Sequence, residues 1–304
     1  MRYLCLVEDI STMDAVITYV DGNDPLWQQD YLIVSKQPAL VKRYRDWGTL
    51  PFLLRGIQRH MPFIDRVFLV VSRESQVPEW VDRSRLRVVL HADIIPPSYL
   101  PTFNSTVIEM FLHRIPGLSA RYLYFNDDFF PVRDAVETDF FPGGRPAIAY
   151  ARHLLAGNLY KQQTRASDRL ARQALGCRPG LFFLRPQHTC SPMLRSACEA
   201  VFERVGPRIL ASLTPLRQPH NVNQYLFLDY QYLSGLGIDR RISNRHISLA
   251  TITPERLTEA IVSPDRQLVC INDVEMGTER YLRLRQAMLL AFLRHFPEKS
   301  VYER

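Results

Sequence analysis

The stretch RYLYFNDD, Arg121–Asp128, decides the expected fold of this 304-residue chain. Its first five residues form a short apolar run rich in aromatic side chains, which predicts a buried strand. The run ends in Asn126, Asp127 and Asp128, and two adjacent acids are more than a turn requires. We therefore expect Asp127 and Asp128 to bind a ligand or a divalent metal at the carboxyl end of this strand.

The segments before this stretch alternate between strand and helix patterns. Apolar runs that predict strands alternate with segments whose apolar residues recur at helical spacing. This rhythm predicts an α/β fold with parallel strand pairs. The strands are expected at 15–20, 66–72 and 86–90, and the helices at 49–60 and 104–115.

The second half of the chain is less regular. Residues 151–185 are polar and arginine-rich and are interpreted as a helical insertion or lid. Ser191 followed by Pro192 is typical of a helix start, with the serine as cap. Further helices are expected at 221–233 and 279–296. We find no convincing linker and expect a single domain over residues 1–304.

The charge balance is positive and depends on arginine. The chain has 38 basic against 31 acidic residues, a net charge of +7, and only four of the basic residues are lysine. Arginine suits phosphate and carboxylate groups, although a GC-rich genome would also favour it. Nucleic-acid binding is disfavoured, because the arginines are spread along the chain and no recognition motif is present.

The cysteines and the hydropathy predict where the protein acts. Five scattered cysteines form no CxxC pair, which argues against a zinc site and favours idle thiols in a reducing compartment. No apolar run approaches the ~20 residues of a membrane span, and no signal peptide is recognisable. We expect a cytoplasmic protein, whose basic surface leaves peripheral contact with the inner membrane face open.

Other residues are candidates on chemical grounds, each with a structural alternative. Asp21, Gly22 and Asp24 follow the first strand and could line a ligand site or form a turn. Glu109, four residues before His113, could act in catalysis or form an exposed helical pair. His188 could act as a general base or be a loop histidine without a catalytic role. Arg217 precedes a predicted helix and could bind a phosphate.

Several of these segments resemble the Stealth family. The segment DAVITYVDGNDPLW (14–27) resembles its first conserved region, and residues 43–130, with LPTFNS, IE, LHRIPGLS and YFNDD, resemble its second. HTCSPMLR through LRQPHNVNQYLFLDYQYLSG (188–235) is similar to the third region, and VCINDVE (269–275) to the fourth. The resemblance covers most of the chain, in order.

This resemblance implies a fold and an activity. The family's core is similar to the GT-A, Rossmann-like fold that binds nucleotide sugars. Its members transfer a hexose 1-phosphate from a nucleotide sugar to a glycan hydroxyl. The nucleotide sugar is typically UDP-linked, for example a UDP-N-acetylhexosamine such as UDP-GlcNAc. The product is a phosphodiester-linked capsular or exopolysaccharide. The alternatives are a metal-dependent GT-A glycosyltransferase and an inactive scaffold.

The resemblance also implies roles for individual residues. The family's catalytic positions fall on Glu109, Asp128, His188 and Arg217, all of the residue type the family uses, which argues against a scaffold. A divalent Mg²⁺ or Mn²⁺ would be held by Asp128 with Asp127 and Asp273. His188 or Glu109 would be the general base, and Arg217 would grip the transferred phosphate. The donor would be bound by Asp21, Gly22, Asp24, Arg43, Arg45, Arg55, Asn104, Ser105, Asn126, Asn223 and Asn272.

Overall fold

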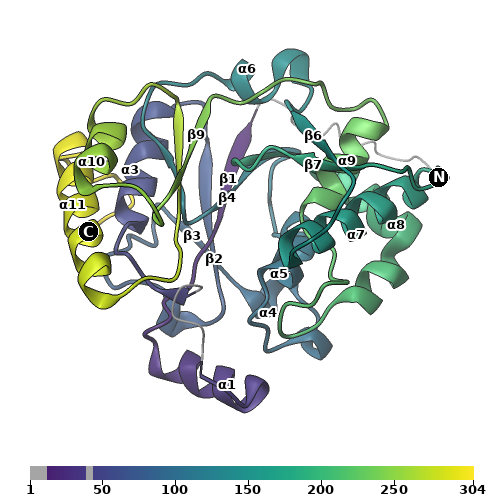
Figure 1. Cartoon of the computed structure of the whole chain (residues 1–304), viewed down its shortest axis with the longest axis horizontal. Helices are drawn as coiled ribbons and strands as arrows, with labels where there is room; N and C mark the ends of the chain where they lie inside the picture. Colours follow the sequence, from purple (N-terminus) through teal and green to yellow (C-terminus); the bar gives the residue numbers. More distant parts are fainter. Residues whose placement is uncertain (1–11, 39–43) are drawn as a thin grey trace.

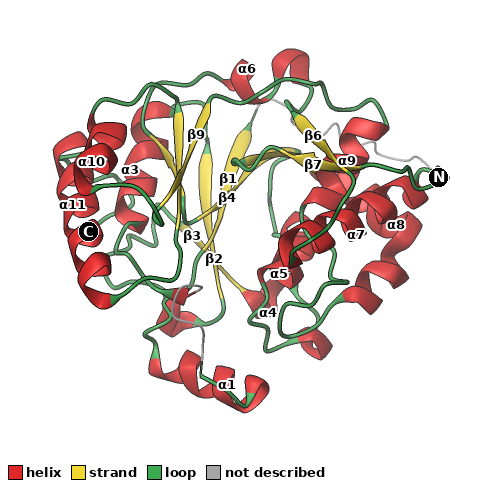
Figure 2. Cartoon of the chain, in the orientation of Figure 1, coloured by secondary structure: helices red, strands yellow, loops and turns green. Residues whose placement is uncertain are grey.

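A five-stranded sheet forms the centre of the computed structural model, which describes residues 12–38 and 44–304. Its strand order is β3-β2-β1-β4-β8, and every neighbouring pair is parallel except β4 and β8. Helices flank the sheet on both sides (Figures 1 and 2). The expected α/β fold class is confirmed. The strands are β1 (Met13–Thr18), β2 (Arg66–Val71), β3 (Arg87–Leu90), β4 (Arg121–Asn126) and β8 (Ser191–Leu194).

Two smaller sheets extend this centre. One has the order β5-β10-β9, and the other is the antiparallel pair β6-β7. The strands are β5 (Phe129–Pro131), β6 (Tyr150–His153), β7 (Phe183–Pro186), β9 (Asn244–Ser248) and β10 (Leu268–Asn272).

The strand pleat divides the apolar interior into two cores. In β1, Ala15 and Ile17 face one core and Val16 faces the other, because successive side chains of a strand point to opposite faces. The first core lies under α3 (Leu50–His60), α10 (Pro254–Val262) and α11 (Thr278–His295). The second lies under α5 (Ser105–Phe111), α7 (Leu159–Ala174), α8 (Arg195–Ser212) and α9 (Tyr225–Leu233).

The remaining helices are short or peripheral. Asp24 caps α1 (Pro25–Ser35), which projects below the sheet in Figure 1. In the part of the chain that the structure describes, the others are α4 (His91–Ile94), α6 (Glu137–Phe140) and four 3₁₀ turns at Glu74–Gln76, Pro97–Tyr99, Leu112–Arg114 and Pro142–Gly144. Within the described ranges, no helix has the length and apolar character needed to cross a membrane.

The predicted helix start at Ser191 is wrong. Ser191–Leu194 forms the edge strand β8, which pairs antiparallel with Arg121–Tyr124 of β4. Pro192 fits there because an edge strand need not donate every backbone N–H group. The helix that follows, α8, begins at Arg195 instead.

The arginine-rich segment 151–185 is only partly helical. Its helix, α7, is flanked by β6 and β7, which pair with each other from Tyr150↔Pro186 to His153↔Phe183. The segment therefore runs along β6, continues through α7 and returns along β7, the antiparallel partner of β6.

Candidate active site

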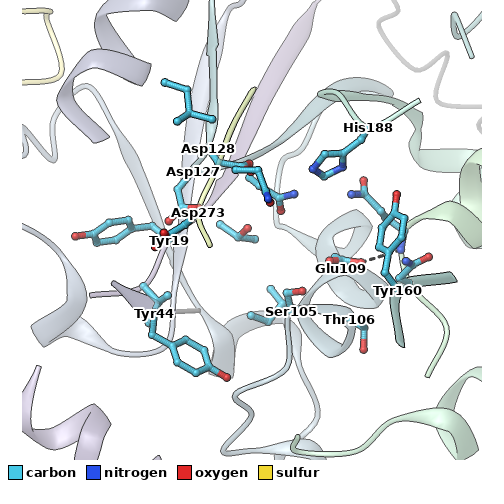
Figure 3. Close-up of a pocket in the computed structure, with 18 of the residues that line it drawn as sticks. Tyr19, Tyr44, Ser105, Thr106, Glu109, Asp127, Asp128, Tyr160, His188 and Asp273 are labelled. Atoms are coloured by element: carbon cyan, nitrogen blue, oxygen red, sulfur yellow. Dashed lines mark hydrogen bonds between the residues drawn. The ribbon is translucent and has the colours of Figure 1, made fainter. Parts of the chain in front are cut away.

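A cavity of about 990 Å³ opens at the carboxyl edge of the central sheet. The residues that follow or end four parallel strands line it, namely Tyr19, Ser72, His91 and Asn126. This is the edge at which parallel α/β sheets bind ligands. Loops and helices from the second half of the chain close the other side, and Figure 3 shows the cavity between the two walls.

One wall of the cavity is acidic. Asp127 and Asp128 occupy the turn between β4 and β5, Asp273 follows β10, and Asp46 precedes α3. Burial and the neighbouring charges of Asp128 and Asp46 raise the pKa of Asp127 to about 7. Burial raises the pKa of Asp128 to about 6, although a hydrogen bond from Cys270 opposes the shift. Carboxylates that raise the pKa of Asp127 lie close to it without a compensating cation.

This acidic wall fits a hard divalent cation. The Oδ1 atom of Asp128 is buried and accepts no hydrogen bond from the residues that the structure describes. Its Oδ2 atom accepts a weak bond of 3.5 Å from the Cys270 thiol. Mg²⁺ and Mn²⁺ prefer carboxylate oxygens, so Asp127, Asp128 and Asp273 form a suitable donor set. A bound cation would relieve their repulsion.

Glu109 and Arg217 meet on the opposite wall. Glu109 lies on α5 and is 7% exposed, and its Oε2 atom accepts a hydrogen bond of 2.8 Å from the backbone N–H of Gln224. Burial raises the pKa of this carboxyl, while the Gln224 bond and the charge of Arg217 oppose the rise. Arg217 donates a hydrogen bond of 2.8 Å to Ser105 Oγ and is otherwise exposed. Its guanidinium is thus oriented beside the cavity with donors to spare.

His188 lies across the cavity from the acids (Figure 3). It occupies the loop between β7 and β8, where Asn244 donates a hydrogen bond of 2.8 Å to its backbone carbonyl. Its Nδ1 atom shares a hydrogen bond of 3.3 Å with the Tyr225 hydroxyl, which in turn shares one of 2.6 Å with Tyr160. Burial and the charges of His246 and Arg185 lower the pKa of His188 to about 4, so its ring is neutral at neutral pH.

Arg45 adds a cation at the acidic wall. Its guanidinium lies 4.4 Å from the ring centre of Tyr281, and its Nε atom is 3.9 Å from Asp273. The Nη1 atom is buried and has no partner among the described residues. An arginine held by these two contacts can donate a hydrogen bond from Nη1 to a phosphate and keep both contacts. The predicted donor-binding residues that join it in the lining are Ser105, Asn126, Asn223 and Asn272.

The structure places other predicted donor-binding residues away from the lining. Arg55 forms a two-bond ion pair with Glu303 and donates to the carbonyl of Phe296, which ties α3 to the chain end. Asp24 caps α1, and Asn104 caps α5 and donates to Asn221. Arg43 lies outside the described residues.

Asp21 and Gly22 shape the turn after β1 rather than the cavity. The Asp21 N–H donates to Gln76, and Asp21 Oδ1 accepts from the N–H of Asn23. Gly22 packs so closely on Tyr44 that a Cβ atom would lie 2.1 Å from its carbonyl oxygen. A residue larger than glycine does not fit there without backbone movement.

Several lining residues were missed by the sequence analysis. Tyr160, Arg185, Gln224 and His246 all line the cavity. Gln224 falls within the stretch that resembles the third conserved region but was not singled out there, and the other three lie where no motif indicated them. Their only early signal was the concentration of arginines in the segment that holds Arg185.

A nitrogen and sulfur cluster lies beside His188. The metal-binding atoms of His188, His246 and Cys270 all lie within 4.8 Å of one another. His246 and Cys270 are register partners on β9 and β10, which brings their side chains together. The sequence analysis did not predict this cluster, because its three residues come from separate segments and form no CxxC pair. The donors would suit zinc, whereas the carboxylates suit Mg²⁺.

Comparison with known sequences agrees with this geometry. The sequence model of Stealth protein CR2, conserved region 2, matches residues 43–147, which include Glu109, Asp127 and Asp128. The chain is similar to the Stealth family over this region. The resemblance expected from the motifs is confirmed.

Three relatives illustrate the similarity of this chain to named proteins. The capsular polysaccharide phosphotransferase WcwK of Streptococcus pneumoniae is 27% identical, over 97% of this chain and 100% of its own. The receptor polysaccharide phosphotransferase WefC of Streptococcus oralis is 29% identical, over 87% of this chain and 91% of its own. A capsular polysaccharide phosphotransferase of Actinobacillus suis is 32% identical, over 72% of this chain and 63% of its own.

Among solved structures, the chain is similar to galactosyltransferase LgtC in complex with donor and acceptor sugar analogs. The TM-score is 0.42 and the identity 11%, over 90% of this chain and 96% of the other. At this identity the likeness concerns the fold alone.

Proposed function

We propose that this protein transfers a sugar 1-phosphate from a nucleotide sugar to a hydroxyl group of a glycan. One observation supports the proposal above the others: four segments far apart in the sequence bring Glu109, Asp128, His188 and Arg217 around one cavity. The relatives named as polysaccharide phosphotransferases support the same reaction class. We take residues 1–304 as a single catalytic domain for this reaction.

Residues of the two walls have different roles in the proposed phosphoryl transfer. The acceptor hydroxyl attacks the phosphorus attached to the sugar and loses its proton to His188. The bond between this phosphorus and the oxygen that bridges the two phosphates breaks, and the nucleoside monophosphate leaves with that oxygen. Arg217 and Arg45 offset the charge on the phosphate oxygens, because catalysis of this reaction is mostly positioning and charge stabilisation.

A divalent cation fits the acidic wall in this proposal. Asp128, with Asp127 and Asp273, would hold Mg²⁺ or Mn²⁺, which supplies positive charge to the diphosphate of the donor. Asn126 and Asn272 line the same wall and can donate hydrogen bonds to the donor's oxygens.

His188 is the better candidate for the base. Its ring is neutral near pH 7 and can accept a proton, and the hydroxyl of Tyr225 fixes one of its nitrogens. The Oε2 atom of Glu109 is occupied by the N–H of Gln224, and Glu109 attracts Arg217. We therefore assign Glu109 to positioning Arg217 and the start of α9.

The nucleotide product tests the reaction directly. Incubation with UDP-N-acetylglucosamine, Mg²⁺ and glycan acceptors should release UMP. Asp128→Asn, His188→Ala and Arg217→Ala should each lower kcat at least about a hundredfold, since each removes a transition-state interaction. Asp265→Asn, at an exposed position outside the cavity lining, is the matched control and should keep wild-type turnover. Release of UDP would mean glycosyl transfer and contradict the proposal.

A further inference from the structure

The positive charge of the protein is concentrated in one segment. Residues 151–185 contain seven arginines and lysines but one acid, a net charge of +6 out of +7 for the whole chain. That acid, Asp168, is buried and pairs with Arg172 at 2.9 Å. The other six cations of the segment have no second acid within the segment to pair with.

Three of these cations form a stripe along α7. Lys161, Arg165 and Arg169 are four residues apart, so they follow one another along one face of the helix. No carboxylate in residues 12–38 or 44–304 forms an ion pair with any of the three. Arg169, Arg152 on β6 and Arg178 after α7 are exposed, whereas Lys161 and Arg165 are half-buried. The stripe therefore presents uncompensated charge to its surroundings.

An apolar tip lies at the end of the β6-β7 pair. The register ends at His153↔Phe183, so the residues just beyond it continue side by side. These are Leu154 and Leu155 on one side and Leu181 and Phe182 on the other. Leu155 is 75% exposed and Leu181 is 73% exposed, so large apolar side chains point into solvent at both halves of the tip. α7 connects the two halves.

The inner side of the same segment belongs to the cavity. Tyr160 and Gln163 of α7 and Arg185 of β7 line it. The cationic stripe and the apolar tip lie outside that lining, and we call them together the outer side of the segment. In Figure 1, β6, β7 and α7 lie on the opposite side of the molecule from α10 and α11.

We propose that the outer side of residues 151–185 docks on an anionic lipid bilayer. Basic side chains are attracted to anionic headgroups, and exposed leucine and phenylalanine side chains enter the boundary between headgroups and acyl chains. A soluble polyanion would account for the stripe but gives no reason for four exposed apolar residues at the tip.

Vesicle sedimentation of the whole chain tests this docking without any nucleotide sugar, so its outcome is independent of the reaction proposed above. The protein should sediment with vesicles of phosphatidylcholine and phosphatidylglycerol but not with phosphatidylcholine alone. Binding should weaken as salt is added, because screening shortens the reach of the charges. Failure to bind the anionic vesicles overturns the proposal.

Two double variants locate the surface. Leu155→Asp with Leu181→Asp removes the tip, and Arg165→Glu with Arg169→Glu reverses the stripe. Each should weaken binding to the anionic vesicles about tenfold or more. Circular dichroism verifies that these exposed substitutions leave the fold intact.

The matched controls lie on α10 and α11. Leu290→Asp with Leu293→Asp, and Arg256→Glu with Arg294→Glu, replace exposed residues and should bind like the wild type. An equal loss in these controls shows non-specific binding and contradicts the assignment. Loss in the arginine variant alone, with the leucine variant unchanged, means that the surface takes a soluble polyanion and overturns docking on a bilayer.

Discussion

Glu109 connects two parts of the cavity wall through one side chain. It accepts the backbone N–H of Gln224, just before α9, and attracts Arg217, which precedes that helix by eight residues. The family motif indicated that this glutamate is functional, but its spacing to His113 could equally have meant an exposed helical pair. The structure buries it instead, which separates these alternatives.

The variant Glu109→Gln tests this positioning role. Its amide oxygen can still accept from Gln224, while the charge that attracts Arg217 is lost. We expect kcat to fall about a hundredfold with a smaller change in donor KM. Steady-state kinetics measure both. Unchanged kcat would remove Glu109 from the site.

His113 gives a pH prediction for stability. It is 5% exposed, and burial lowers its pKa to about 3 from an ordinary 6.5. As the pH falls below 6.5, the His113 ring therefore binds a proton in the unfolded chain but not in the folded chain. The free energy of unfolding contributed by this neutral ring is complete above pH 6.5 and is lost between pH 6.5 and about 3.

The variant His113→Phe should remove this acid sensitivity. The ring packs 4.9 Å from Phe202, so phenylalanine suits the surroundings. Below pH 6.5 the wild type should lose up to ~1.4 kcal/mol per pH unit relative to the variant. Urea denaturation at several pH values measures the difference. Parallel stability curves for the two proteins would show that His113 titrates normally.

At the scale of elements, the sequence predicted the central strands and several helices but misjudged the edge strand. The apolar runs that form β1, β2, β3 and β4 are buried and strongly patterned, so local signals sufficed. Ser191–Leu194 has the chemistry of a helix start and becomes β8 because β4 offers it an unpaired edge. That preference arises from tertiary pairing, which no local pattern reports.

Arg55 is a site residue whose role the sequence analysis misjudged for the same reason, namely tertiary contacts that no local pattern reports. It supports a prediction about stability. The sequence placed it in the donor site, whereas the structure uses it to tie α3 to Glu303. Both side chains are nearly buried, so Arg55→Ala should lower the free energy of unfolding by about 3 kcal/mol. Folded enzyme should keep its kcat and donor KM. Arg59→Ala, at an exposed neighbour, is the control and should cost less than about 1 kcal/mol.

At the scale of the whole molecule, the cavity joins residues from both halves of the chain. Asp127 and Asp128 come from the sheet, whereas His188, Arg217 and Gln224 come from the segments after β7. Family motifs identified the four proposed catalytic residues in advance. They could not identify Tyr160, Arg185 or His246, because these residues reach the cavity only through the packing of α7, β7 and β9.

The acidic wall leads to a prediction about metal dependence. Asp128 raises the pKa of Asp127, and a divalent cation held by these carboxylates would offset their repulsion. Chelation with EDTA should abolish turnover, and added Mg²⁺ or Mn²⁺ should restore it. Full activity in the chelator would contradict the role given to these carboxylates. Cys177→Ser, at an exposed thiol outside the cavity lining, should respond to EDTA like the wild type.

The fate of the donor's phosphorus tests the central claim most directly. UDP-N-acetylglucosamine labelled with ³²P in the phosphate attached to the sugar is incubated with enzyme, Mg²⁺ and glycan acceptor. Transfer of sugar 1-phosphate predicts that the label enters the glycan in a phosphodiester and that unlabelled UMP is released. Label found entirely in UDP, with unlabelled sugar joined to the glycan, would contradict the account.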